Sequence, residues 1–161
     1  MALMTPAVKK LGFMKARTLT TVLFATLCFT MQTHAQPSNA PVTAESFIWK
    51  SQRGGELKYL LYLPKDYVAK KDERWPLMLF LHGAGERGTD VQRVAIHGPT
   101  SLVKKGTNFP FIIVAPQCPD NQRWDTEALL QLLNHVTAQH PVDTNRIYVT
   151  GLSAGGAMTS V

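Results

Sequence analysis

Short apolar runs alternate with polar segments along most of this chain. Five of the runs predict strands: 47–49, 57–63, 76–81, 111–114 and 146–150. The runs 76–81 and 111–114 are apolar at nearly every position, which is typical of parallel strands buried on both faces of a sheet. The segment 51–55 between the first two runs contains two glycines and predicts a hairpin turn.

Two segments between these runs have the spacing of helices. The leucines and valine at 129, 132, 133 and 136 form an apolar stripe, with Asp125 or Thr126 as the candidate N-cap. A shorter helix is predicted at 99–105. Because helices alternate with strands, we expect an α/β fold, a mostly parallel sheet with flanking helices, in which the stripe belongs to the core.

The first 35 residues have the pattern of a signal peptide. Four basic residues precede an uncharged stretch at 19–31, and small residues precede Gln36. We therefore expect cleavage after Ala35 and a secreted or periplasmic protein with no stable membrane anchor, although a retained N-terminal anchor is the alternative. Residues 36–45 then form a polar lead-in to a single domain at 46–161.

Composition narrows the possible partners. Removing the leader takes away four basic and no acidic residues, which lowers the formal net charge from +6 to about +2. We expect no nucleic-acid binding, because the basic excess belongs largely to the leader. The cleaved chain keeps one cysteine, Cys118, which we interpret as a small buried apolar residue, although a cysteine partner elsewhere stays open. No cluster of metal ligands occurs, and we expect neither a metal nor a cofactor.

The most specific motif follows the last predicted strand. Residues 151–155 read Gly-Leu-Ser-Ala-Gly, which is the G-x-S-x-G pattern of a nucleophile elbow. Such a turn exposes the hydroxyl of Ser153 and points the amide of Ala154 at a developing oxyanion. Gly151 and Gly155 leave room for the tight turn. The alternative is an ordinary glycine-rich loop.

A second glycine-rich segment follows the predicted strand 76–81. Residues 82–88 read His-Gly-Ala-Gly-Glu-Arg-Gly. An oxyanion hole takes its second amide from the loop at this place in a serine hydrolase, so Gly83 or Ala84 is the candidate donor. The spacing of the glycines matches neither common phosphate-binding motif.

Together with Ala-Pro-Gln-Cys-Pro at 115–119 and the segment 143–156, these motifs resemble the secreted esterase and predicted-peptidase branch of the α/β-hydrolase superfamily. Its neighbours are feruloyl-esterase-like, polyhydroxybutyrate-depolymerase-like and phospholipase/carboxylesterase-like proteins. The resemblance runs from Phe47 to the end of the chain. It implies Ser153 as nucleophile, with Ala154 and the Gly83/Ala84 region as oxyanion hole.

The order of catalytic residues in that fold is serine, acid, histidine, so both partners of Ser153 are expected beyond Val161. We thus expect a domain truncated after the elbow and inactive by itself. His82 is expected to brace the backbone of its loop, and His97 to lie in a turn. We interpret His135 and His140 as surface residues.

We therefore predict a serine hydrolase that cleaves carboxylic esters through an acyl-enzyme on Ser153, with a small-molecule or polymer-borne ester as substrate. A serine peptidase and an acyltransferase are the enzymatic alternatives. The non-enzymatic alternatives are a non-catalytic binding module on the same fold and a truncated reading frame. Asp143 and Arg146 flank the last strand at the end opposite Ser153, where they predict an ion pair or a turn cap.

Overall fold

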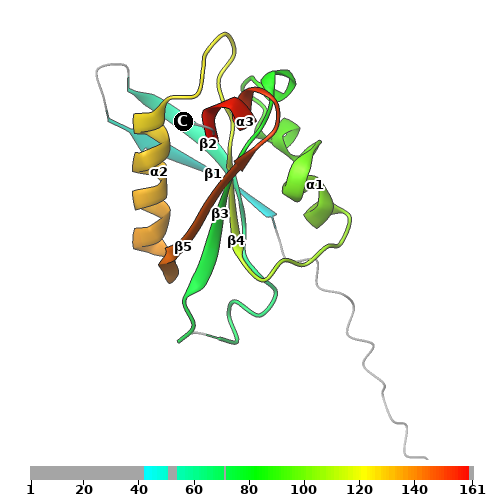
Figure 1. The fold of residues 1–161 in the computed structure, drawn as a ribbon, viewed down its shortest axis with the longest axis vertical. Helices are drawn as coiled ribbons and strands as arrows, with labels where there is room; N and C mark the ends of the chain where they lie inside the picture. Colours follow the sequence, from blue (N-terminus) through cyan, green and yellow to red (C-terminus); the bar gives the residue numbers. More distant parts are fainter. Residues whose placement is uncertain (1–41, 51–53, 71, 160–161) are drawn as a thin grey trace, which may run out of the picture. The chain divides into compact units, whose positions relative to one another are not determined.

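The structure is a computed structural model that describes residues 42–50, 54–70 and 72–159. The strands are β1 (Val42–Trp49), β2 (Gly55–Tyr62), β3 (Trp75–Leu81), β4 (Ile112–Pro116) and β5 (Val142–Gly151). They form one mixed sheet in the order β1-β2-β4-β3-β5 (Figure 1). β1, β2 and β4 pair antiparallel, whereas β4, β3 and β5 pair parallel. The predicted α/β class is confirmed, but the sheet is mixed, with two parallel and two antiparallel pairings, where a mostly parallel sheet was expected; its parallel part leads to the elbow.

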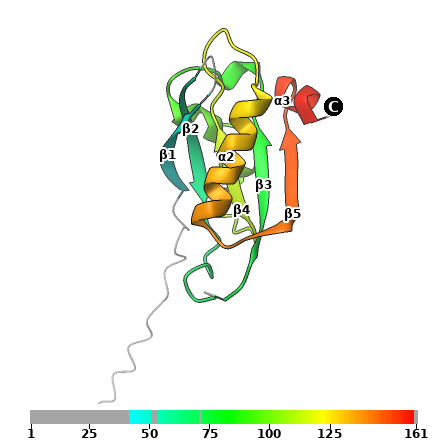
Figure 2. The ribbon, with the colours of Figure 1, turned by 90° about the vertical axis from the view of Figure 1, so that its left-hand side faces the viewer.

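Helices cover both faces of this sheet. They are α1 (Gly98–Lys104), α2 (Thr126–Gln139), α3 (Ala154–Thr159) and the 3₁₀ segments η1 (Ala84–Glu86) and η2 (Val91–Ala95). α2 lies along one face, as Figure 2 shows, and α1 lies on the other. The Asp125 carboxylate caps α2 by accepting from the N–H of Ala128 at 3.1 Å, which decides between the two predicted caps.

Two apolar clusters fill the space on either side of the sheet. Alternate residues of β2 enter different clusters: Tyr59 and Leu61 face α2, and Leu60 and Tyr62 face η2 and α1. Every residue of β4 is buried, as expected of a strand covered on both faces. The predicted stripe of α2 is core, since three of its four members are buried and the fourth packs against them. The second cluster was not predicted, because 3₁₀ segments are too short to show a helical period.

The ends of two strands differ from the prediction. β1 begins at Val42, inside the predicted polar lead-in, because it pairs with β2 from the Val42–Tyr62 position onward. An edge strand pairs through its backbone and needs few apolar side chains. β5 begins at Val142 and carries the predicted ion pair, in which Arg146 Nε lies 2.7 Å from Asp143 Oδ2.

Parts of the prediction fall outside the described residues. They are the signal peptide at 1–35 with its cleavage site, the first part of the lead-in, and residues 51–53 of the hairpin turn predicted at 51–55. Among the helices that the structure describes, none has the length and apolar character to cross a membrane.

Candidate active site

Ser153 occupies the turn between β5 and α3, and its backbone is left-handed. Its φ is 51°, in a region that residues with a side chain seldom adopt. Among the described non-glycine residues, only Asn121, with a φ of 57°, also has a positive φ. The N–H of Leu152 donates to the carbonyl of Leu81 at 2.9 Å and ties the turn to the end of β3. The Ser153 side chain is exposed. A strained turn that presents a serine to solvent is the geometry of a nucleophile elbow.

The two glycines of the motif are required by close backbone contacts. An ideal Cβ on Gly155 would lie 2.0 Å from the carbonyl oxygen of Leu81. One on Gly151 would lie 2.4 Å from the carbonyl carbon of Gly155. Neither position can hold a side chain unless the backbone moves, so the start of α3 rests directly on the end of β3.

The loop after β3 lies beside the serine. β3 and β5 are parallel neighbours with Leu81 opposite Gly151, so the segments that follow them leave the sheet at the same edge. An ideal Cβ on Gly83 would lie 3.6 Å from the Cβ of Ser153. Gly83 is buried there, whereas Ala84 begins η1 and is exposed. The fold thus brings the two segments that were predicted to share an oxyanion hole into contact.

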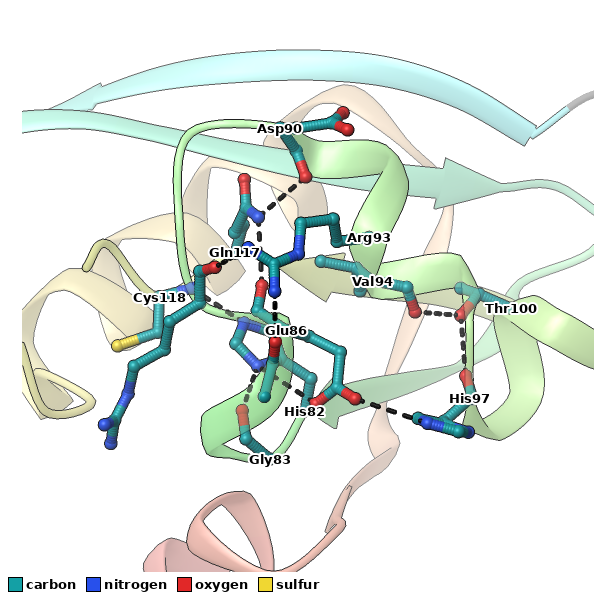
Figure 3. A network of polar contacts seen from close by, with 12 residues as sticks. His82, Gly83, Glu86, Asp90, Arg93, Val94, His97, Thr100, Gln117 and Cys118 are labelled. Carbon is teal, nitrogen blue, oxygen red and sulfur yellow. Dashed lines mark hydrogen bonds and ion pairs between the residues drawn. The ribbon is translucent and has the colours of Figure 1, made fainter.

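His82 ties this loop to the segment that follows β4, as Figure 3 shows. Its Nε2 accepts from the N–H of Cys118 at 2.9 Å, so the proton is on Nδ1, which lies 2.6 Å from the carbonyl of Gly83 and donates to it. The ring is 2% exposed, and burial lowers the pKa of His82. A neutral histidine whose two nitrogens are both bonded to backbone fits the bracing role expected of it.

A set of hydrogen bonds that the sequence did not reveal holds the remainder of the loop. The buried Gln117 amide donates to the carbonyls of Glu86 at 3.0 Å and Asp90 at 2.7 Å. Arg93 donates to the carbonyls of Gly85 and Arg87 (Figure 3). Gln117 directly follows the fully apolar strand β4. A polar residue at that place was the one sign of this role in the sequence.

The other described histidines are engaged elsewhere. His140 Nδ1 lies 2.8 Å from the Tyr67 hydroxyl, and the His135 ring packs on Phe47 with the ring centres 4.7 Å apart. Both are half-buried and not fully exposed as expected of surface residues, because Phe47 of β1 packs on the His135 ring and Tyr67 packs on His140. His97 Nε2 lies 3.5 Å from a carboxylate oxygen of Glu86. Within the part of the chain that the structure describes, no histidine is hydrogen-bonded to the Ser153 hydroxyl.

A cavity opens next to the elbow. It has a volume of about 330 Å³ and is lined by Arg87, Arg123, Trp124, Ala154, Ala157 and Met158. The Trp124 ring packs on His82 with the ring centres 4.8 Å apart, so one wall of the cavity is continuous with the brace of the loop. The volume lies within the range of small-molecule sites.

Among the described residues, no three His, Cys, Asp or Glu side chains lie together in a group that could hold a metal ion. Cys118 is 1% exposed, which confirms its interpretation as a small buried residue. Burial raises the pKa of its thiol, and the nearby Arg87 guanidinium offsets part of that effect.

The comparisons with known proteins point to one class of enzyme. Poly(3-hydroxyalkanoate) depolymerase C of Paucimonas lemoignei is 30% identical in an alignment 124 residues long that covers 66% of this chain and 28% of that protein. Poly(3-hydroxybutyrate) depolymerase of Ralstonia pickettii is 28% identical in an alignment 146 residues long that covers 74% of this chain and 30% of that protein. The crystal structure of a thermostable esterase superposes with a TM-score of 0.54 at 32% identity, covering 73% of this chain and 36% of the esterase. No protein-family model matches the chain.

The sheet order, the elbow and the structural match define the α/β-hydrolase fold. Within it, the relatives of this chain are polyhydroxyalkanoate depolymerases and esterases. The chain spans less than a third of the length of the two depolymerases.

Proposed function

We propose that this protein is a serine hydrolase that cleaves carboxylic esters, with Ser153 as the nucleophile. One observation carries the proposal: Ser153 is exposed in a left-handed turn, and the glycines on both sides of it admit no side chain. A turn of this strain persists only where the surrounding structure holds it, and strained backbone concentrates at functional sites. The match to esterases and depolymerases favours an ester over a peptide bond as the substrate.

The reaction follows from this geometry. The Ser153 hydroxyl attacks the ester carbonyl, its proton passes to a base, and the alcohol leaves to give an acyl-enzyme that water then hydrolyses. The N–H of Ala154 and that of Gly83 or Ala84 stabilise the oxyanion. Gly83 is favoured as the second donor, since an ideal Cβ on it would lie only 3.6 Å from the Cβ of Ser153. This chemistry needs no metal or cofactor.

We infer that the base is not one of the described histidines, because none of them is hydrogen-bonded to the Ser153 hydroxyl. His82 bonds to backbone through both nitrogens, and His140 is bonded to Tyr67. We therefore propose that the acid and the histidine of the triad lie outside the described residues, and that residues 36–161 alone give no Ser153-dependent turnover. Triad members act as a unit, so a serine without its histidine loses nearly all of the rate gain.

The test uses the protein carried through any coding sequence that follows Val161. Hydrolysis of p-nitrophenyl butyrate is measured for Ser153→Ala, with Ser46→Ala on the exposed edge strand as the matched control. We expect kcat to fall by roughly a thousandfold or more for Ser153→Ala alone. Ordinary turnover by a folded Ser153→Ala protein would refute the proposal. A peptide p-nitroanilide cleaved faster than the ester would replace the esterase with a peptidase.

A further inference from the structure

The cavity beside the elbow has an unusual distribution of charge. Two of its six lining residues, Arg87 and Arg123, carry guanidinium groups, and none carries a carboxylate. The other four are apolar or aromatic: Trp124, Ala154, Ala157 and Met158. Ala154 directly follows the proposed nucleophile, so the cationic cavity begins at the reacting centre.

Arg87 and Arg123 differ from the other described arginines in the partners of their guanidinium groups. Arg146 is paired with Asp143, while Arg74 and Arg93 donate to backbone carbonyls. Within residues 42–50, 54–70 and 72–159, neither Arg87 nor Arg123 forms an ion pair. Arg87 lies against the Cys118 thiol. Because burial raises the pKa of this thiol, the thiol carries no negative charge that would compensate the Arg87 guanidinium.

The nearby carboxylates of Asp120 and Asp125 do not line this cavity. Asp125 accepts from the N–H of Ala128 as the cap of α2. Asp120 lies on the side of Gly88, where an ideal Cβ would be 3.7 Å from a carboxylate oxygen of Asp120 and 3.3 Å from Arg93. The lining of the cavity therefore carries two positive charges and no negative one.

We propose that this cavity binds a carboxylate carried by the ester substrate. The proposal rests on the proposed function and adds a substrate class to it: esters of short aliphatic acids or alcohols that bear a free carboxylate. The planar guanidinium matches a carboxylate with two parallel hydrogen bonds, and the Trp124 and Met158 side chains cover the aliphatic part. Because Ala154, the residue after Ser153, lines this cavity, a carboxylate bound there would place the ester carbonyl of the same substrate near the Ser153 hydroxyl.

The first experiment measures the anion site without any turnover. Trp49 and Trp75 are 9% and 5% exposed, whereas Trp124 is half-buried in the cavity wall, so soluble quenchers report mainly on Trp124. The measured quantity is the quenching constant of tryptophan fluorescence for iodide, divided by the quenching constant for neutral acrylamide. We expect this ratio to fall by about twofold in Arg87→Gln and Arg123→Gln, since a cationic cavity concentrates iodide. The control is Lys70→Gln, which removes a cation 5.6 Å from the ring centre of Trp75.

The second experiment measures substrate preference in the active protein. Monoethyl succinate is compared with diethyl succinate, and acetoxyacetate with its methyl ester, which places the carboxylate on the acyl or the alcohol side. We expect the anionic member of at least one pair to be preferred, and the ratio of kcat/KM values to fall about tenfold in each arginine variant, as for a lost charged hydrogen bond. The ratio should not change in Lys70→Gln.

The results separate the two proposals. An iodide ratio that is the same in both arginine variants and in Lys70→Gln overturns the anion site, and so does a neutral ester preferred in both pairs. A protein that hydrolyses none of the four esters counts against the proposed function, and the iodide ratio then decides on the anion site by itself.

Discussion

A methyl group added at Gly155 would test how tightly the elbow rests on the sheet. The ideal Cβ would lie 2.0 Å from the oxygen of Leu81, 2.5 Å from its carbonyl carbon and 2.8 Å from the oxygen of His82. Contacts below 3.0 Å are not tolerated, so the shortest one must open by about 1 Å. All three atoms belong to backbone, and no rotamer change can relieve them.

The size of the effect follows from two opposing terms. Overpacking against fixed backbone costs about 3 kcal/mol or more, while alanine gains about 1 kcal/mol over glycine within a helix. We therefore expect Gly155→Ala to lower the free energy of unfolding by about 2 kcal/mol, which corresponds to roughly 8 °C in Tm for a domain of this size.

Gly85→Ala is the matched control. No heavy atom lies within 4 Å of an ideal Cβ on Gly85, so this variant should stay within about 0.5 kcal/mol of the parent. Urea midpoints from pulse proteolysis at low protein concentration measure both variants. If Gly155→Ala unfolds at the same urea concentration as Gly85→Ala, the close contact between α3 and β3 is not what holds the elbow.

Three further outcomes are expected. Burial lowers the pKa of His82 and of His140 below the ordinary 6.5, so the unfolded chain binds more protons just below that pH and stability should fall as pH drops through 6.5; urea midpoints of His82→Gln should lose part of that slope. N-terminal sequencing of exported protein should begin at Gln36, and an intact leader would argue against the signal peptide. Val149 is 47% exposed on β5, whose outer edge has no strand partner within the described residues, so Val149→Lys should reduce self-association in ultracentrifugation. A parent chain that is already monomeric would contradict this last expectation.

Local patterns were enough to identify most elements and the central motif. β3 and β4 were predictable because strands buried on both faces read as continuous apolar runs, and α2 because its buried face repeats every three to four residues. Gly151, Ser153 and Gly155 stand out for a similar reason. Residues that meet within one tight turn must be close in sequence, so their spacing records their geometry.

The neighbours of that motif were decided by the tertiary structure. Gly83 lies 70 positions before Ser153 in the chain, and it reaches the serine because β3 and β5 are adjacent and parallel. The hydrogen bonds of His82 and Gln117 to backbone are equally non-local. β1 extends to Val42 because β2 offers it a partner, and His140 is half-buried because Tyr67 packs on it. A sequence records the spacing of residues along one segment, whereas strand order decides which segments meet, and the contacts that complete this site depend on that order.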